Sequence, residues 1–226
     1  MRIAFFGGSF DPPHRGHLAI AEAAADRLSL DRVLLAPVGL QPLKTAHSSA
    51  SFAHRLAMVR LAVNQNERLV ASEADAPLPG GEPNYTFDTL VRLRRTLSAA
   101  DTLFLLVGAD SMRTLPKWRR SSDLLLFCNL ILAGRPGFPL DRIPFLLPPG
   151  LSCRPAAPEN GVSRLELTGD CARRSTIYLL PELNEPVSGT EVRRELAADR
   201  KLAGLLTPPV LDYITVHRLY RSRDGV

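Results

Sequence analysis

Two histidines, His14 and His17, stand three residues apart in the stretch GGSFDPPHRGHL, and their type and spacing point to chemistry on an anion. Before them, the apolar run Ile3–Phe6 predicts a buried strand, the Gly7-Gly8 pair breaks it, and a helix is expected from about Arg15. A strand that enters a glycine turn and opens a helix is a common phosphate-binding arrangement. Glycine admits a ligand close to the backbone, and the N–H groups at a helix N-terminus attract anions.

The histidine pair favours phosphate binding over metal binding. Zincin-type histidine pairs stand four residues apart on a helix with a Glu between them, and that Glu is missing here. We therefore expect both rings to donate hydrogen bonds to a polyphosphate, beside the backbone amides of Gly8, Ser9 and Phe10. Metal ligation and a purely structural role remain the alternatives.

Alternating strands and helices should position this corner. Strands are expected at Asp31–Ala36, Leu69–Ser72, Thr102–Val107 and about Leu126–Ala133; helices are expected at about Arg15–Leu28, Ala53–Asn64 and Thr86–Leu97, with Thr86 as the N-cap of the last. This order predicts a three-layer α/β/α fold with a mainly parallel sheet. Ligands bind beyond the carboxyl ends of such strands. The turns after the first, second and fourth strands are thus expected to converge on one site.

The second half of the chain reads less regularly. Prolines and glycines over 136–174 predict a long irregular excursion, with one short strand near Leu165–Leu167. A strand is expected again at Thr176–Leu180, and Ser188 followed by Glu191 is a capping-box signature that opens a helix. A last helix is expected over Val210–Leu219. We predict one domain over 1–226, whose C-terminal part, about 188–220, is helical.

Composition limits the class of protein. The chain has 226 residues, of which 45% are apolar, as in soluble globular proteins, and no apolar run approaches the ~20 residues that span a bilayer. A signal peptide is not recognisable, so a cytoplasmic location and no membrane partner are expected. The three cysteines show no metal-like spacing, and Cys128 lies in an apolar run that predicts a core thiol.

The net charge of +5 suits an anionic partner, either nucleic acid or phosphorylated metabolites. The basic residues are dispersed, which favours a solvated basic surface over a nucleic-acid groove.

Further along the chain, other segments resemble one family. GGSFDPPHRGHL resembles the nucleotide-binding signature of the nucleotidyltransferase superfamily, whose HxGH element is His14–His17 here. Ser188–Arg193 matches the superfamily's second signature. The chain as a whole resembles bacterial nicotinate-nucleotide adenylyltransferases in PVGLQPLK, HRLAM, NYTFDTL, LVGADS with LPKW, RPGFPL and LLTPPVLDYI, in the family's order. Departures are Gly189, where the family usually has a second Ser or Thr, and the segment before Lys44, which lacks the usual consecutive prolines and His.

This resemblance implies a Rossmann-like fold and a reaction. Members transfer AMP from ATP to the phosphate of nicotinate mononucleotide, which releases pyrophosphate and forms nicotinate adenine dinucleotide, the deamido form of NAD. The attacking phosphate oxygen is already ionised at pH 7, so catalysis should depend on positioning and charge stabilisation. The implied catalytic residues are His14, His17 and Arg193. Mg²⁺ would be carried by the ATP phosphates, with no dedicated protein ligand for the metal.

The resemblance also divides the binding residues between two substrates. The implied ATP-binding residues are Gly7, Gly8, Ser9, Phe10, His14, His17, Gly108, Asp110, Ser188 and Arg193. The implied acceptor-binding residues are Lys44, Tyr85, Thr86, Thr89 and Trp118. Three of these keep a structural alternative: Asp110 as a helix N-cap, Lys44 as an exposed loop residue and Trp118 as core packing.

Other functions stay open at this point. The nearest alternative is the same reaction on nicotinamide mononucleotide or another phosphorylated acceptor. A fragment of a class I aminoacyl-tRNA synthetase would also contain an HxGH-type element, but this sequence has no recognisable KMSKS-like element. A nucleic-acid-binding module would explain the basic charge. We expect ATP and nicotinate mononucleotide as partners and no nucleic acid; the oligomeric state is not readable from the sequence.

Overall fold

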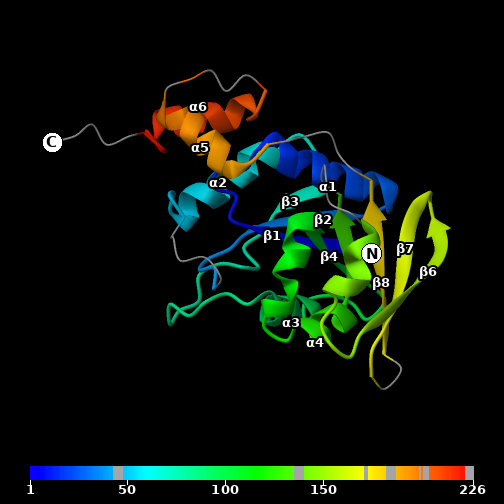
Figure 1. Cartoon of the computed structure of the whole chain (residues 1–226). Coiled ribbons are helices and arrows are strands. Elements are labelled where there is room, and N and C mark those ends of the chain that lie inside the picture. The colour runs from blue at the N-terminus through cyan, green and yellow to red at the C-terminus, as the bar shows by residue number, and fades with distance from the viewer. Residues whose placement is uncertain are drawn as a thin grey trace.

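In a computed structural model of the chain, residues 1–42, 48–134, 140–170, 173–181, 187–198, 200 and 204–221 are described, without the side chains of Asp110, Leu140 and Asp141. These residues form one sheet of eight strands in the order β3-β2-β1-β4-β5-β8-β7-β6 (Figure 1). The strands are β1 (Arg2–Gly8), β2 (Arg32–Pro37), β3 (Leu69–Ala71), β4 (Thr102–Gly108), β5 (Asn129–Ala133), β6 (Ser152–Glu159), β7 (Val162–Thr168) and β8 (Arg174–Leu180).

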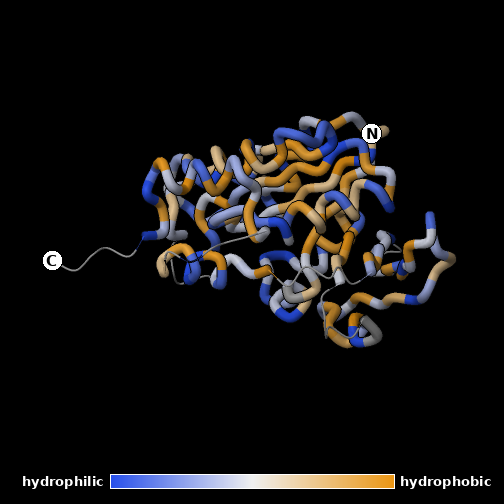
Figure 2. Tube along the Cα trace, turned by 90° about the horizontal axis from the view of Figure 1, so that it is seen from above, coloured by the Kyte–Doolittle hydropathy of each residue, from blue (hydrophilic) through white to orange (hydrophobic). Residues whose placement is uncertain are grey.

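Helices cover both faces of the sheet. The α-helices are α1 (Arg15–Arg27), α2 (Phe52–Val63), α3 (Thr86–Arg94), α4 (Ser121–Phe127), α5 (Gly189–Ala197) and α6 (Pro208–Val216), and three short 3₁₀ helices are η1 (Ala109–Arg113), η2 (Leu115–Lys117) and η3 (Leu140–Leu146). One core cluster joins the sheet to α1 and α2, and a second joins it to α3 and α4 on the opposite side (Figure 1). Figure 2 shows the hydrophobic residues concentrated along the central strands. The predicted three-layer α/β/α fold is confirmed.

The winding of the sheet reverses beside β1. The chain runs from β1 outward through β2 to β3, then returns to the other side of β1 with β4 and continues outward to β5, all in parallel pairing. The carboxyl ends of β2, β1 and β4 therefore lie next to one another. As predicted, the turns after these three strands converge, and this is the switch point at which α/β folds bind ligands.

The irregular excursion predicted over 136–174 is wrong for most of the described residues there. Strands β6 and β7 form an antiparallel hairpin that adds to the sheet through β8. Its two-residue turn is Asn160-Gly161, with φ of 50° and 74°, which is the left-handed geometry that an Asn-Gly hairpin turn requires. Pro155 and Pro158 are tolerated because β6 is the outermost strand and needs no hydrogen-bonded neighbour on its free side.

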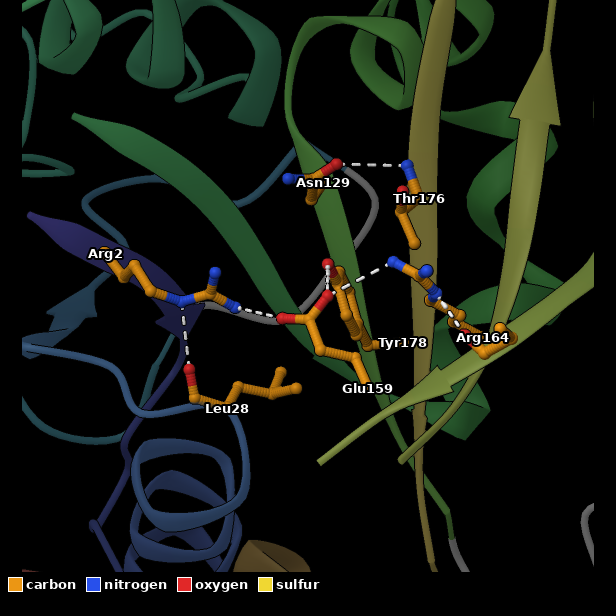
Figure 3. A network of polar contacts seen from close by, with 8 residues as sticks. Arg2, Leu28, Asn129, Glu159, Arg164, Thr176 and Tyr178 are labelled. Carbon is orange, nitrogen blue, oxygen red and sulfur yellow. Dashed lines mark hydrogen bonds and ion pairs between the residues drawn. The ribbon is translucent and has the colours of Figure 1, made fainter. Parts of the chain in front are cut away.

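A half-buried network of hydrogen bonds and ion pairs joins this hairpin to the beginning of β1 (Figure 3). Glu159 accepts hydrogen bonds from Arg2 (2.9 Å), Tyr178 (3.0 Å) and Arg164 (3.2 Å). Arg2 also donates to the backbone oxygen of Leu28, at 3.0 Å. The two cations offset the half-buried carboxylate, so β6, β7 and β8 are tied to β1 and to the end of α1.

Several element boundaries differ from prediction: α3 ends at Arg94 and not at Leu97, and α6 spans Pro208–Val216 and not Val210–Leu219. The strand expected from about Leu126 begins at Asn129, because residues 121–127 form the short helix α4. An unbroken apolar run carries no periodicity that separates a buried helix from a buried strand. Thr86 is the first helical residue of α3 and not its N-cap, which is Tyr85. Cys128 is buried, as predicted.

The C-terminal helices pack on α2. Met58 of α2 shares a third core cluster with Val192 of α5 and with Val210 and Ile214 of α6. This packing brings the C-terminal part of the chain over the carboxyl end of β1 (Figure 1). Within the described ranges, no helix is long and apolar enough to cross a membrane.

Candidate active site

The glycine turn, residues 7–13, begins within β1: the predicted break at Gly7-Gly8 is wrong, because the strand continues through Gly8. The turn is held in a fixed shape. The backbone N–H of Val38, just beyond β2, donates to the Gly8 carbonyl at 2.9 Å. Phe10 has a left-handed φ of 45°, and its ring is buried against the rings of Phe6 and His17, with centroids 5.6 and 4.8 Å away. A Cβ added to Gly7 would lie 2.8 Å from the Phe5 ring. The turn is therefore shaped before any ligand arrives.

The two histidines lie together at the first turn of α1. Their rings are stacked, with centroids 3.7 Å apart, and His14 is the N-cap residue. The His14 backbone N–H donates to Nδ1 of His17 at 3.2 Å. Because Nδ1 of His17 accepts this bond, the proton of its neutral ring sits on Nε2. His17 can thus donate from Nε2 at a helix N-terminus, where an anion is favoured.

Helix α5 brings the second basic element to the same turn. Ser188 caps this helix through its side chain, which accepts from the Glu191 N–H at 3.2 Å, as the capping-box signature predicts. Nη1 of Arg193 donates to the backbone carbonyl of Asp11 at 2.8 Å, across 182 residues of sequence. A Cβ on Gly189 would lie 3.7 Å from the same carbonyl. The structure therefore joins the His14–His17 and Ser188–Arg193 segments.

Asp11 holds this junction together, and the sequence analysis assigned it no role. Its carboxylate is 5% exposed and accepts from the N–H groups of Ser49 (2.6 Å) and Ala50 (3.1 Å). The Tyr220 hydroxyl donates to it at 2.7 Å. The carboxylate is thus satisfied by donors from two distant segments.

Arg55 is the second missed residue and the largest fully buried side chain of the described residues, with 1% exposed. Its guanidinium donates to the carbonyls of Ser9 (2.7 Å), Val38 (2.7 Å) and Ala50 (3.2 Å). Burial lowers the pKa of Arg55, and the nearby Asp11 carboxylate opposes that shift. One cation therefore fixes the glycine turn, the end of β2 and the loop before α2 relative to one another.

The spacing of α2 contained a signal for Arg55. It lies three and four residues before Met58 and Val59 and therefore shares their buried face of the helix. A positive side chain on a buried face needs several acceptors, and the two adjacent loops supply them.

The loop after β2 is joined to the loop before α3. The Asn84 side chain, 3% exposed, accepts from the Leu40 N–H at 2.9 Å and donates to the Ala76 carbonyl at 2.8 Å. Gly39 fits only because it lacks a side chain, since a Cβ there would lie 2.5 Å from the Pro77 nitrogen. These contacts form a rigid rim on the side of the site where the acceptor residues were predicted.

The predicted acceptor residues lie at different depths. Tyr85 is half-buried, and the Arg119 guanidinium lies 4.8 Å from the centre of its ring. Trp118, next to Arg119, is half-buried, packs on the second core cluster and donates from Nε1 to Thr114 at 3.3 Å. Thr89 is fully buried, and its hydroxyl donates to Asp75 at 2.6 Å. Arg119, the neighbour of Trp118, thus contacts Tyr85, and Thr89 lies one helical turn after Tyr85, with its N–H bonded to the Tyr85 carbonyl at 3.0 Å.

Two predicted contacts are not described. Gly108 ends β4, as predicted, but the side chain of Asp110 and the whole of Lys44 lie outside the described residues. In the part of the chain that is described, no group of three His, Cys, Asp or Glu side chains is placed to bind a cation.

A cavity of about 650 Å³ lies elsewhere, at the β6–β7 hairpin. Its lining is mostly apolar and includes Cys153, Leu165 and Leu179. Because it lies at β6, β7 and β8, the edge of the sheet far from the switch point beside β1, and lacks paired charged groups, we take the β1 corner and not this cavity as the candidate active site.

The fold and this corner define a class, the nucleotidyltransferases, and comparison with known proteins agrees. The cytidylyltransferase-like family model matches residues 5–195. Probable nicotinate-nucleotide adenylyltransferases from Chromobacterium violaceum and Laribacter hongkongensis are 38% and 39% identical to the chain; the alignments cover 97% and 98% of this chain and 99% and 96% of theirs. The chain therefore belongs to the nicotinate-nucleotide adenylyltransferase family.

A solved structure supports the fold. The Plasmodium falciparum nicotinic acid mononucleotide adenylyltransferase, complexed with NaAD, superimposes with a TM-score of 0.71 over 97% of both chains at 18% identity. At that identity the likeness concerns the fold, and it confirms the predicted Rossmann-like α/β class.

Proposed function

We propose that this chain transfers AMP from ATP to nicotinate mononucleotide, forming nicotinate adenine dinucleotide and pyrophosphate, in NAD biosynthesis. The observation that carries the proposal is the corner at which the stacked histidines of α1 and Arg193 of α5 meet beside the glycine turn. Family membership at 38–39% identity over nearly the full chain supports the acceptor.

In the proposed reaction, a phosphate oxygen of nicotinate mononucleotide attacks the α-phosphorus of ATP. The bond from that phosphorus to the bridging oxygen of the β-phosphate breaks, and pyrophosphate leaves with the electron pair. The attacking oxygen carries no proton at pH 7, so a general base is not needed. The residues must instead align the two anions and stabilise the charge that builds up between them.

We assign the phosphates to the basic corner. His17 donates from Nε2 toward the α-phosphate, and His14, stacked beneath it, holds its ring in place and adds a second donor. Ser188 and Arg193 contact the β- and γ-phosphates, while the backbone of residues 7–10 lines the chain of phosphates. Gly108 and Asp110 at the end of β4 take the ribose. Nucleotidyltransferases use a divalent cation bound to the nucleotide phosphates; we propose Mg²⁺, which neutralises the leaving pyrophosphate.

The acceptor is assigned to the opposite rim. Tyr85 and the N–H of Thr86, at the start of α3, receive the nicotinate carboxylate, and Trp118 stacks on the pyridine ring. The Arg119 guanidinium lies over the Tyr85 ring and pairs with Asp88 at 3.4 Å, so the N–H groups at the start of α3 are what suits a carboxylate better than an amide. Thr89 supports this rim from below through Asp75, and Lys44 contacts the mononucleotide phosphate. We further propose a cytoplasmic location, because both substrates are phosphorylated metabolites of that compartment.

Stoichiometry tests the proposal. With ATP, Mg²⁺ and nicotinate mononucleotide, the protein should release one pyrophosphate for each dinucleotide formed, and neither product should appear when one substrate is omitted. CTP in place of ATP provides a matched control, because it carries the same triphosphate with another base. Pyrophosphate release without dinucleotide, or equal rates with CTP, would contradict the assignment.

A further inference from the structure

The chain end beyond α6 turns back toward the active site. Arg218 and Tyr220 adopt left-handed φ values of 51° and 62°, and the Leu219 N–H donates to the Ile214 carbonyl at 3.0 Å. Two left-handed residues that are not glycine cost free energy, so contacts made by the turn must offset that cost. One such contact is the 2.7 Å hydrogen bond from the Tyr220 hydroxyl to Asp11, 209 residues earlier.

Tyr220 and Arg193 bond to different groups of Asp11. The carboxylate of Asp11 takes the tyrosine hydroxyl, whereas its backbone carbonyl takes Nη1 of Arg193 at 2.8 Å. Nη2 of Arg193 also donates to the Thr190 hydroxyl, at 3.3 Å. A shift of Asp11 would therefore move the acceptor that sets the direction of the Arg193 guanidinium.

The Tyr220 hydroxyl keeps its proton over the working pH range of an enzyme. Burial, followed by the negative charge of Asp11, raises the pKa of the Tyr220 hydroxyl well above its ordinary value of 10. The hydroxyl therefore remains a donor to Oδ1 of Asp11, the oxygen that also accepts from the Ala50 N–H, while Oδ2 accepts from the Ser49 N–H.

We propose that Tyr220 is a positioning residue for adenylyl transfer: by holding Asp11, it aims the Arg193 guanidinium at the pyrophosphate portion of ATP. This inference rests on the proposed function of Arg193. It predicts that loss of the hydroxyl weakens recognition of the two terminal phosphates and leaves recognition of the acceptor unchanged.

The test uses Tyr220→Phe, which keeps the ring and removes only the hydroxyl. Loss of one hydrogen bond to a charged group, transmitted in part to Arg193, should raise the KM for ATP and, in the reverse reaction, the KM for pyrophosphate about fivefold. The KM values for nicotinate mononucleotide and for the dinucleotide should stay within about twofold, because neither contains those phosphates. Tyr213→Phe is the matched control, since its hydroxyl bonds to His54 at 3.0 Å in the α2–α6 contact, and it should change none of these values.

A double-mutant cycle separates positioning from folding. If Tyr220 acts through Arg193, adding Tyr220→Phe to Arg193→Ala should raise the KM for pyrophosphate no further. Equal rises in all four KM values, no rise for pyrophosphate, or additive effects in the cycle would overturn the inference. Failure of the proposed function looks different, because the unmodified protein itself would then form no dinucleotide, or Arg193→Ala would leave the KM for pyrophosphate unchanged.

Discussion

At the scale of single residues, Arg55 shows how a buried charge organises this site. It donates to carbonyls of the glycine turn, the end of β2 and the loop before α2, and the first of these lines the proposed ATP phosphates. A buried cation with full hydrogen bonding costs much to disturb, because any carbonyl that loses its donor remains desolvated.

Arg55→Lys keeps the charge but cannot reach all three carbonyls. We expect it to lower the free energy of unfolding by about 2–3 kcal/mol, measured by urea denaturation. Arg60→Lys on the same helix is the control, since Arg60 pairs with Glu73 where both side chains are 61% exposed, and it should cost less than ~0.5 kcal/mol. Equal losses for the two variants would show that the buried hydrogen bonds of Arg55 contribute no more stability than the exposed ion pair of Arg60.

His17 is the residue whose loss should affect chemistry most specifically. Removal of a charge-stabilising donor typically costs two to three orders of magnitude in rate, so His17→Ala should lower kcat at least ~100-fold. The change should leave the unfolding midpoint close to that of the unmodified protein. His54→Ala, a histidine of the α2–α6 contact, should retain kcat, and a loss below tenfold in His17→Ala would count against transition-state stabilisation.

The residues that could be predicted from sequence were those with a local signature. His14 and His17 follow a glycine turn, and Ser188 precedes Glu191, so short-range spacing predicts a phosphate-binding corner and a helix cap, of which the structure confirms the cap. Asp11 and Tyr220 act through partners 38 to 209 residues away, and Arg55 acts through carbonyls of three loops, 5 to 46 residues away, so no local pattern contains these pairings. Of these three residues, only Arg55 could have been recognised from the sequence, because helical spacing places it on the buried face of α2.

At the scale of elements, the rim before α3 contains a buried carboxyl group. Asp75 is 5% exposed, and burial raises its pKa above the ordinary value of 3.8, although Thr89, Arg92 and Asn84 oppose the shift. A carboxyl with a raised folded pKa binds its proton more tightly in the folded state. Its contribution to stability is therefore complete below the unfolded pKa and is lost as pH rises through the folded pKa.

Asp75→Asn removes this titration. The free energy of unfolding of the unmodified protein, minus that of the variant, should fall as pH rises from about 3.5 to about 7, measured by urea denaturation at several pH values. Thr89→Val provides a second test, because it removes the hydroxyl that lowers the pKa of Asp75. When Asp75→Asn is made in the Thr89→Val protein, the same difference in the free energy of unfolding should fall more steeply with pH. A difference that stays constant with pH would contradict the buried, titrating carboxyl.

The central strands were predicted from the sequence, whereas the β6–β7 hairpin was not. The central parallel strands were found because apolar runs followed by glycine or proline are distinctive. The β6–β7 hairpin was missed because the density of prolines suggested a loop, although Asn160-Gly161 is a strong hairpin turn. An edge strand tolerates proline where a central strand does not. Whether a strand lies at the edge depends on the order of strands in the complete sheet, which the sequence of one segment does not contain.

At the scale of the whole molecule, we propose that the chain is one domain. The C-terminal helices share a core with α2, and Arg193 and Tyr220 both bond to Asp11. Unfolding should therefore be a single transition, with coincident midpoints for Trp118 fluorescence and far-ultraviolet circular dichroism. Tyr213→Phe, which leaves those contacts to Asp11 in place, should keep the two midpoints coincident. Two separate transitions would show that the C-terminal helices fold independently.

The whole account depends on which acceptor the site selects. The N-terminus of α3, which begins at Thr86, favours a carboxylate on the pyridine ring over an uncharged amide. The most direct test is the ratio of kcat/KM for nicotinate mononucleotide to that for nicotinamide mononucleotide, measured side by side with saturating ATP. We predict a ratio of at least about tenfold in favour of the nicotinate. Equal or better use of the amide would contradict the proposed function.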